Sequence, residues 1–158
     1  MTILFTNNTP NVFLNVTPSW HGAPVAFDAH PIGVWYDVAA GKWAVFNEGS
    51  MDAIPTGTVF NVLIDTPIVH GVFLQQATAT NTSKNSTVID NSVTNNDPNA
   101  LVFVTPNFNP QGQGGTYEDH ILGVSYHNGK WNIFNADGAA MSTSVAFNVL
   151  ASDPYPTA

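Results

Sequence analysis

The sequence contains no cysteine and no arginine, and both absences restrict what the protein can do. Without cysteine, neither a disulfide framework nor a thiolate metal site is available. The positive charges are Lys42, Lys84 and Lys130, against eleven acidic residues, which gives a formal net charge of −8. No basic patch can be assembled from so few cations, so we expect neither nucleic acid nor an anionic membrane as a partner.

Charge of either sign is scarce, since Asp, Glu, Lys and Arg make up 9% of the 158 residues. Solubility must instead depend on Asn, Thr, Ser and Gln, while Gly and Pro are spread throughout the chain. This composition favours an extracellular or cell-surface β protein over a cytosolic enzyme. No apolar run reaches the ~18 residues of a membrane-spanning helix, so we expect no insertion into a bilayer. The first residues show no secretory leader, and we expect the sequence of a mature form.

Three short strings occur twice in the same order, and this duplication organises the whole chain. The first set reads His30-Pro-Ile-Gly-Val-Trp-Tyr36, Lys42-Trp-Ala-Val-Phe-Asn47 and Phe60-Asn-Val-Leu63. The second set reads His120-Ile-Leu-Gly-Val-Ser-Tyr126, Lys130-Trp-Asn-Ile-Phe-Asn135 and Phe147-Asn-Val-Leu150.

Alternation of apolar and polar residues indicates β-strands in both copies. Residues 31–36 and 42–47 predict a hairpin, and the Asn128-Gly129 turn predicts its counterpart in the second copy. No window has a convincing helical period. Further strands are expected at 12–17, 58–64, 68–80 and 101–105, with 81–99 as a polar loop. We therefore predict an all-β fold of two tandem antiparallel β-sandwich-like domains, residues 1–66 and 67–158.

The two copies differ at their beginnings. Residues 7–11 align with residues 95–99 at an offset of 88, but the roughly twenty residues before the second stretch have no counterpart before the first. The first copy should therefore lack an opening strand, and a sandwich that lacks a strand exposes unpaired edges. A strand from another subunit can fill such an edge. The expected donor strand is the apolar N-terminal segment, Thr2, Ile3, Leu4, Phe5 and Thr6.

His30 and His120 begin equivalent strands, and acidic residues precede both. One hypothesis is an acid–histidine pair, used for proton transfer or for binding a metal. The alternative is that each histidine hydrogen-bonds a loop where its strand begins. No serine or cysteine nucleophile accompanies the pair, and repetition of the position favours the structural role. We therefore predict no catalytic residue and no enzyme.

Asparagines and acidic residues follow the tryptophan-containing strands in both copies. A calcium loop would use Asn47, Glu48 and Asp52, or Asn135 and Asp137. Calcium takes about six to eight oxygen ligands, more than these carboxylates provide, and turns in which Asn or Asp bonds its own backbone explain the same residues. We therefore expect no cofactor and no metal, with calcium as the alternative.

The tryptophans form two groups. Trp43 and Trp131 occur in both copies and are expected in the core. Trp35 and Trp20 have no tryptophan counterpart, and Trp35 lies opposite the apolar face of its strand. We interpret Trp35 and Trp20 as residues of a protein interface, with sugar stacking as the alternative.

Asn-X-Ser/Thr triplets are frequent in this asparagine-rich chain and arise partly by chance. Asn81 and Asn85 lie in the predicted polar loop and are the preferred glycosylation candidates, with Asn15 as a further one. Glycans are therefore among the expected attachments or ligands.

The repeated strings resemble a family of secreted, mostly bacterial β-repeat domains, in which the middle string often reads Lys-Trp-Ala-Ile-Phe-Asn. The stretch from Asn95 to Pro106 also resembles this family, so the resemblance covers nearly the whole chain. It implies an extracellular setting and no established activity. The chain is also similar to protomers of pilus-like fibrils built from such domains.

These observations lead to a functional hypothesis about assembly. We expect a structural subunit of an extracellular filament, a homopolymer whose identical subunits join head to tail by β-strand donation. The alternative is an extracellular carbohydrate-binding, lectin-like module.

Overall fold

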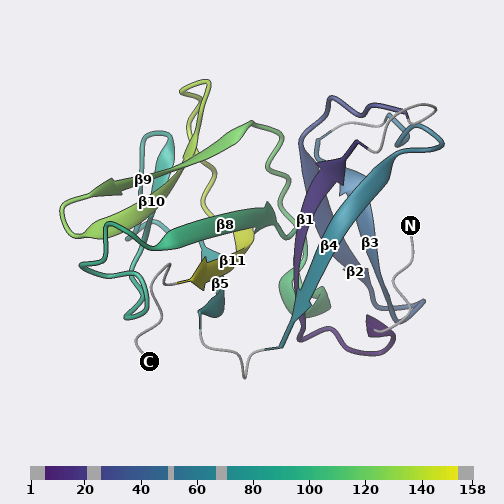
Figure 1. Ribbon diagram of the computed structural model, residues 1–158, viewed down its shortest axis with the longest axis horizontal. Helices are drawn as coiled ribbons and strands as arrows, with labels where there is room; N and C mark the ends of the chain where they lie inside the picture. The colour runs from purple at the N-terminus through teal and green to yellow at the C-terminus, as the bar shows by residue number, and fades with distance from the viewer. Residues whose placement is uncertain (1–5, 21–25, 50–51, 67–70, 153–158) are drawn as a thin grey trace.

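A computed structural model describes residues 6–20, 26–49, 52–66 and 71–152. These residues form β-strands and no α-helix, which confirms the predicted all-β class. Every pair of neighbouring strands is antiparallel. No helix in this part of the chain is long and apolar enough to cross a membrane. Figure 1 shows two groups of strands side by side, which we call the N-terminal half (residues 6–65) and the C-terminal half (residues 71–152).

The N-terminal half contains two sheets of two strands each. One sheet pairs β1 (Phe13–Ser19) with β4 (Val59–Asp65), and the other pairs β2 (Ile32–Asp37) with β3 (Lys42–Asn47). The second pair is the predicted hairpin, in which Trp35 lies opposite Ala44 and Tyr36 opposite Trp43. Proline does not end β1 as we expected, because Pro18 lies within the strand opposite Phe60.

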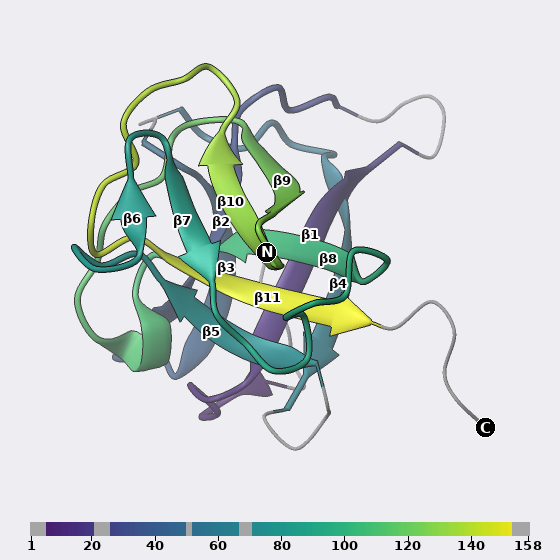
Figure 2. The same ribbon diagram turned by 90° about the vertical axis from the view of Figure 1, so that its left-hand side faces the viewer.

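The C-terminal half contains a three-stranded and a four-stranded sheet. The first has the order β5 (Val72–Gln76), β11 (Ala146–Ser152), β8 (Leu101–Pro106). The second has the order β6 (Thr82–Ser83), β7 (Ser86–Ile89), β10 (Lys130–Asn135), β9 (Leu122–His127). Figure 2 shows β5 beside β11 and β7 beside β10.

Two sequence predictions need correction in this half. The strand expected at 68–80 ends at Gln76, and the loop expected at 81–99 contains β6 and β7. The chain turns between β5 and β6 because the Asn81 carboxamide oxygen accepts a hydrogen bond from the Thr78 N–H at 2.7 Å. Such side-chain bonds compete with the strand ladder. Residues 72–89 therefore supply β5 to the three-stranded sheet and both β6 and β7 to the four-stranded sheet.

Each half has its own core. The N-terminal core gathers around Trp43 and Leu14, 1% and 0% exposed, and the C-terminal core around Phe147 and Ile133, both 0% exposed. Trp43 is buried as predicted, whereas its counterpart Trp131 is only partly buried and packs against the second core. Apolar burial of this kind is the main source of stability in a chain without disulfides.

Several local contacts recur at the offset of 88 that the sequence predicts. The indole N–H of Trp43 donates to the Thr9 carbonyl at 3.0 Å, and that of Trp131 to the Asp97 carbonyl at 2.9 Å. The N–H of Asn8 donates to the Gly41 carbonyl at 2.8 Å. The equivalent pair in the C-terminal half, Asn96 and Gly129, makes the same bond at 2.8 Å. Segments that align at the offset of 88 therefore make the same hydrogen bonds in both halves.

Candidate functional site

Two strands of the C-terminal half have a partner on each side, whereas their counterparts in the N-terminal half do not. β10 pairs with β9 and β7, and β11 pairs with β8 and β5. The matching strands are β3 and β4, each of which pairs with a single strand among the described residues, β2 and β1 respectively. Among the described residues, the edges without a strand partner therefore lie along residues 43–46 of β3 and 59–63 of β4, where β7 and β5 would lie by analogy with the C-terminal half.

The missing partners leave the edge strand β4 more exposed than its counterpart. Asn148 and Val149 of β11 are each 0% exposed. The matching residues of β4 are Asn61, which is exposed, and Val62, which is partly buried. Leu63 is 47% exposed although it is a large apolar residue. An open edge with apolar side chains is a template for pairing with another strand.

The predicted donor segment lies largely outside the described residues, which include none of Thr2, Ile3, Leu4 and Phe5. Thr6 is described and is 0% exposed, as is its counterpart Thr94. In the C-terminal half, Ile89 of β7 lies opposite Trp131. At the offset of 88, the residue aligned with Ile89 is Met1, which lies outside the described residues.

Buried asparagines join the two halves. The Asn109 side chain accepts from the Tyr36 N–H at 2.7 Å and donates to the Tyr36 carbonyl at 2.8 Å. Asn148 donates to the Leu14 carbonyl at 3.0 Å and accepts from the Asn107 amide at 2.9 Å. These bonds satisfy backbone groups that the short sheets leave unpaired.

The bonds of Asn148 with Leu14 and Asn107 can be tested against a matched position. Asn61 occupies the same place in the first Phe-Asn-Val-Leu string but is exposed, whereas Asn148 is buried. We expect Asn148→Ala to lower the free energy of unfolding by about 1 to 3 kcal/mol, because it leaves a buried carbonyl and a buried amide unpaired. Asn61→Ala should change it by less than about 0.5 kcal/mol. Urea titration of both variants measures the difference. Equal effects at the two positions would contradict the assignment of Asn148 to the contact between the halves.

Aromatic rings form a second contact between the halves. Phe46 of β3 lies edge-on to Phe108, with ring centroids 5.9 Å apart, and to Tyr117, at 6.1 Å. Phe108 and Tyr117 lie 4.6 Å apart. Arrangements of this kind add roughly 0.5 to 1.5 kcal/mol per pair beyond the area that they bury.

The two tryptophans predicted at an interface lie in different surroundings. Trp35 is partly buried on β2, opposite Ala44. Trp20 is 63% exposed and follows the end of β1, next to Phe27 at a centroid distance of 6.3 Å. Trp20 and Trp35 therefore belong to separate surface features.

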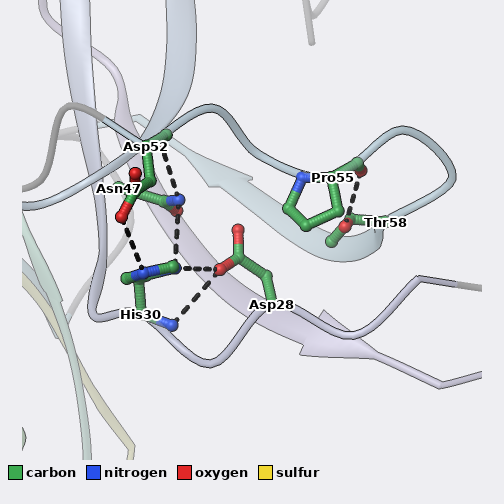
Figure 3. Close-up of polar contacts among 6 residues, drawn as sticks. All are labelled: Asp28, His30, Asn47, Asp52, Pro55 and Thr58. Carbon is green, nitrogen blue, oxygen red and sulfur yellow. Dashed lines mark hydrogen bonds and ion pairs between the residues drawn. The ribbon is translucent and has the colours of Figure 1, made fainter.

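Figure 3 shows how His30 is held between loops. Its Nδ1 lies 2.7 Å from Asp28 Oδ1, and its Nε2 lies 3.5 Å from Asp52 Oδ2. Burial alone would raise the pKa of Asp28, but hydrogen bonds with His30 and Asn47 outweigh burial and hold the pKa below its ordinary value. His30 therefore links the start of β2 to the loop that carries Asp28 and the loop that carries Asp52.

His120 has a similar arrangement with different partners. Its Nδ1 lies 2.8 Å from Asp137 Oδ2, and its Nε2 lies 3.4 Å from Asp119 Oδ1. Burial would lower the pKa of His120, but the hydrogen bond and charge of Asp137, with Asp119 and Glu118, raise it. Both histidines line one open hollow of about 280 Å³ between the halves, together with prolines and aliphatic side chains. Both histidines thus contact aspartate carboxylates, and their structural role stays a prediction.

Glu48 is the most deeply buried carboxyl group at the contact between the halves, 1% exposed. Its Oε2 accepts the Glu118 N–H at 3.0 Å. Burial, together with the neighbouring charges of Glu118 and Asp119, raises the pKa of Glu48 to about 8. The carboxyl group therefore stays protonated at neutral pH. A Cβ at Gly33 would overlap Glu48 Oε1, so glycine is required beneath this side chain.

One group of acidic and histidine side chains in the described part of the chain has metal-ligand spacing. Ligand atoms of Glu118, Asp119 and His120 lie within 4.8 Å of one another. His120 is already engaged with Asp137, and Glu118 is buried, so we assign no metal to this group. In the two loops considered as the calcium alternative, the Asn47 amide nitrogen donates to the Asp52 carbonyl and the Asn135 amide nitrogen to the Ala139 carbonyl, each at 3.2 Å.

The glycosylation candidates occupy structured positions. The amide nitrogens of Asn81 and Asn85 donate to the carbonyls of Gln76 and Asn135, each at 2.9 Å. These are the nitrogens to which a glycan would be attached. Asn15 lines an apolar hollow of about 430 Å³ at the seam between the halves.

Sequence reasoning did not identify Asn107, Asn109, Glu48 or Glu118 as residues that join the halves. Their partners lie far away in the sequence, so no local pattern marks them. The one signal in the sequence is the Phe-Asn-Val-Leu string, which occurs in both copies. Its asparagine in the second copy, Asn148, bonds the Leu14 carbonyl of the other half, whereas its asparagine in the first copy, Asn61, is exposed.

Comparison with known proteins gives one match. The profile of a domain of unknown function, DUF7452, matches residues 1–50 and 33–151. The two matched segments overlap and together span most of the chain. No curated protein and no solved structure matches this sequence.

Proposed function

We propose that this chain, which belongs to the family of the domain of unknown function DUF7452, is a structural subunit of an extracellular filament. Its partners are identical subunits, which join head to tail by β-strand donation. In this proposal it is a binding and scaffolding protein without catalytic activity.

The proposal includes an architecture of two tandem antiparallel sandwich-like domains, residues 1–66 and 67–158, related by internal duplication. The recurring strings support the duplication, as do the matched indole bonds of Trp43 and Trp131. The overlapping family matches are consistent with a repeat. In this architecture β1 to β4 correspond to β8 to β11, and β5 to β7 have no counterpart in the first domain.

The observation that carries the proposal is the pair of open edges on β3 and β4. The C-terminal half covers the equivalent edges of β10 and β11 with β7 and β5. A strand from a second copy would restore this arrangement in the N-terminal half and would satisfy the unpaired backbone groups. Because donor and acceptor are different surfaces, the contact is heterologous and produces an open filament when its rotation does not close.

The strand-donation proposal predicts the effect of removing the donor. Negative-stain microscopy should show filaments for the full chain, and deletion of residues 1–5 should shorten or abolish them, because Ile3, Leu4 and Phe5 would fill the acceptor edge. The deletion retains Thr6, which is buried within its own chain. Thermal unfolding of the monomer should change little.

Deletion of residues 153–158 is the matched control. Pro154 and Pro156 cannot supply ladder N–H groups, so this tail is a poor donor and its loss should leave filaments intact. Filaments of normal length and stability after deletion of residues 1–5 would contradict donation by the N-terminus. Absence of filaments for the full chain under all conditions would contradict the filament function itself.

A further inference from the structure

The N-terminal half presents two neighbouring aromatic side chains to solvent. Trp20 is 63% and Phe27 is 68% exposed, and their ring planes are inclined at 59°. Single exposed apolar residues are ordinary, but adjacent large aromatic rings are typical of protein contacts.

The aligned residues of the C-terminal half show what such a pair can contact, although one of them, Tyr117, is itself 56% exposed. Trp20 aligns with Phe108, and Phe27 with Tyr117. Phe108 and Tyr117 both contact Phe46 on the other half, at centroid distances of 5.9 and 6.1 Å. The aromatic pair of the C-terminal half, Phe108 and Tyr117, therefore packs against Phe46 of the N-terminal half.

The C-terminal half carries the corresponding acceptor. Phe46 aligns with Phe134, which lies beside an open hollow of about 370 Å³ lined by Asn85, Ser86, Ser125, His127, Asn132 and Phe134. Ser125 occupies the position of Trp35, so a small side chain stands where the N-terminal half has an indole. The exposed pair has the larger ring, because Trp20 stands at the position of Phe108.

The strand edge beside this hollow is also open. In the N-terminal half, the Phe108 N–H donates to the Val34 carbonyl at 2.9 Å, and Val34 is 0% exposed. The aligned residue of β9, Val124, is 36% exposed. β9 pairs only with β10 among the described residues, so its second edge offers the same backbone groups that β2 presents to Phe108.

We propose that the contact between the two halves is repeated between copies. Trp20 and Phe27 of one copy dock on Phe134 and the Ser125 hollow of the next copy. This inference rests on the proposed self-assembly and adds to strand donation a second contact between copies. The two surfaces lie on opposite halves, so each copy carries one aromatic pair and one acceptor, and the contact propagates in one direction.

Two lysine substitutions test the interface. Trp20→Lys and Ser125→Lys are each expected to raise the concentration needed for filament formation by roughly thirty-fold or more, as for loss of an interface hot spot. Both residues are exposed, so folding should be retained and checked by thermal unfolding. Val93→Lys is the matched control, because Val93 is 42% exposed and lies outside both surfaces.

Mixing the two variants gives the sharper result. The Trp20→Lys copy retains its acceptor, and the Ser125→Lys copy retains its aromatic pair, so one intact contact remains in the mixture. At concentrations between the wild-type threshold and the raised threshold of the variants, sedimentation velocity should show monomers for each variant alone and a one-to-one dimer for the mixture. Absence of that dimer, or filaments from Trp20→Lys at the wild-type concentration, would overturn the interface while leaving the filament function standing.

A sugar-stacking role for the aromatic pair would give a different pattern. Filaments from Trp20→Lys together with lost retention on polysaccharide would assign the pair to sugar binding and would overturn the interface. If the full wild-type chain forms neither filaments nor oligomers, the interface is overturned and the proposed function fails with it.

Discussion

Replacing Trp43 with alanine should lower the free energy of unfolding by about 3 to 5 kcal/mol. The indole is 1% exposed, contacts Tyr36 edge-on at a centroid distance of 5.5 Å and donates to the Thr9 carbonyl at 3.0 Å. The substitution removes this packing, leaves a cavity and frees a carbonyl of the preceding turn. Few other side chains in the small N-terminal core can compensate.

The matched control is Trp131→Ala. Trp131 makes the same kind of contacts, with Tyr126 at 5.7 Å and the Asp97 carbonyl at 2.9 Å, but it is only partly buried. Its loss should therefore cost less than the loss of Trp43. Urea titration followed by circular dichroism measures both changes. An effect of Trp43→Ala below about 1 kcal/mol, or one smaller than that of Trp131→Ala, would contradict the assignment of Trp43 to the centre of the core.

The hairpins could be predicted from the sequence because their determinants are local. The alternation in residues 31–36 and 42–47 predicts both the strands and the residues that face the core, and the structure confirms β2 and β3. Asn128 has φ of 51° and Gly129 has φ of 79°, the left-handed conformations that an Asn-Gly turn requires. The turn between β9 and β10 is therefore specified by these two residues.

β7 could not be predicted by the same reasoning, because a polar residue occupies one of its buried positions. Thr87 is 0% exposed and shares the buried face of the strand with Ile89, so the strand reads as a polar loop. Its hydroxyl accepts from Gln75 Nε2 at 3.3 Å and donates to Asn81 Oδ1 at 3.2 Å. Such partners satisfy a buried hydroxyl group, but their positions are known only from the folded chain.

The segment of the second copy that has no match in the first folds differently from the sequence prediction. Comparison of the copies predicted one unmatched strand, whereas this segment supplies β5 to one sheet and β6 and β7 to another. The described residues of the N-terminal half contain no counterpart of these strands. Of the proposed contact between copies, Trp20 could be singled out from the sequence, whereas the hollow beside Phe134 is known only from the structure.

Glu48 makes the stability of the protein depend on pH. Its pKa is raised from an ordinary value of 4.5 to about 8, first by burial and then by the nearby Glu118 and Asp119. The folded chain keeps this proton up to about pH 8, whereas the unfolded chain releases it near pH 4.5. The unfolded state then binds fewer protons, so the free energy of unfolding should fall as pH rises from about 4.5 to 8.

Two neighbouring groups act in the same direction. Burial raises the pKa of Glu118, so its contribution is also lost as pH increases. The raised pKa of His120 stabilises the fold at pH values where the imidazole is protonated, and that contribution is lost as the pH rises through its folded pKa. The pKa of Asp28 is lowered, so this group affects the free energy of unfolding only at acid pH, where protonation of Asp28 destabilises the fold.

Glu48→Gln isolates the contribution of this carboxyl group. Glutamine retains an oxygen that accepts the Glu118 N–H but carries no charge at any pH, so the variant should match the wild type at pH 5 within about 1 kcal/mol. At pH 9 it should be more stable than the wild type by on the order of 3 to 5 kcal/mol, because the wild type must then hold a buried carboxylate. Urea titrations across this range measure both curves. An unchanged pH slope in the variant would show that Glu48 is not the titrating group.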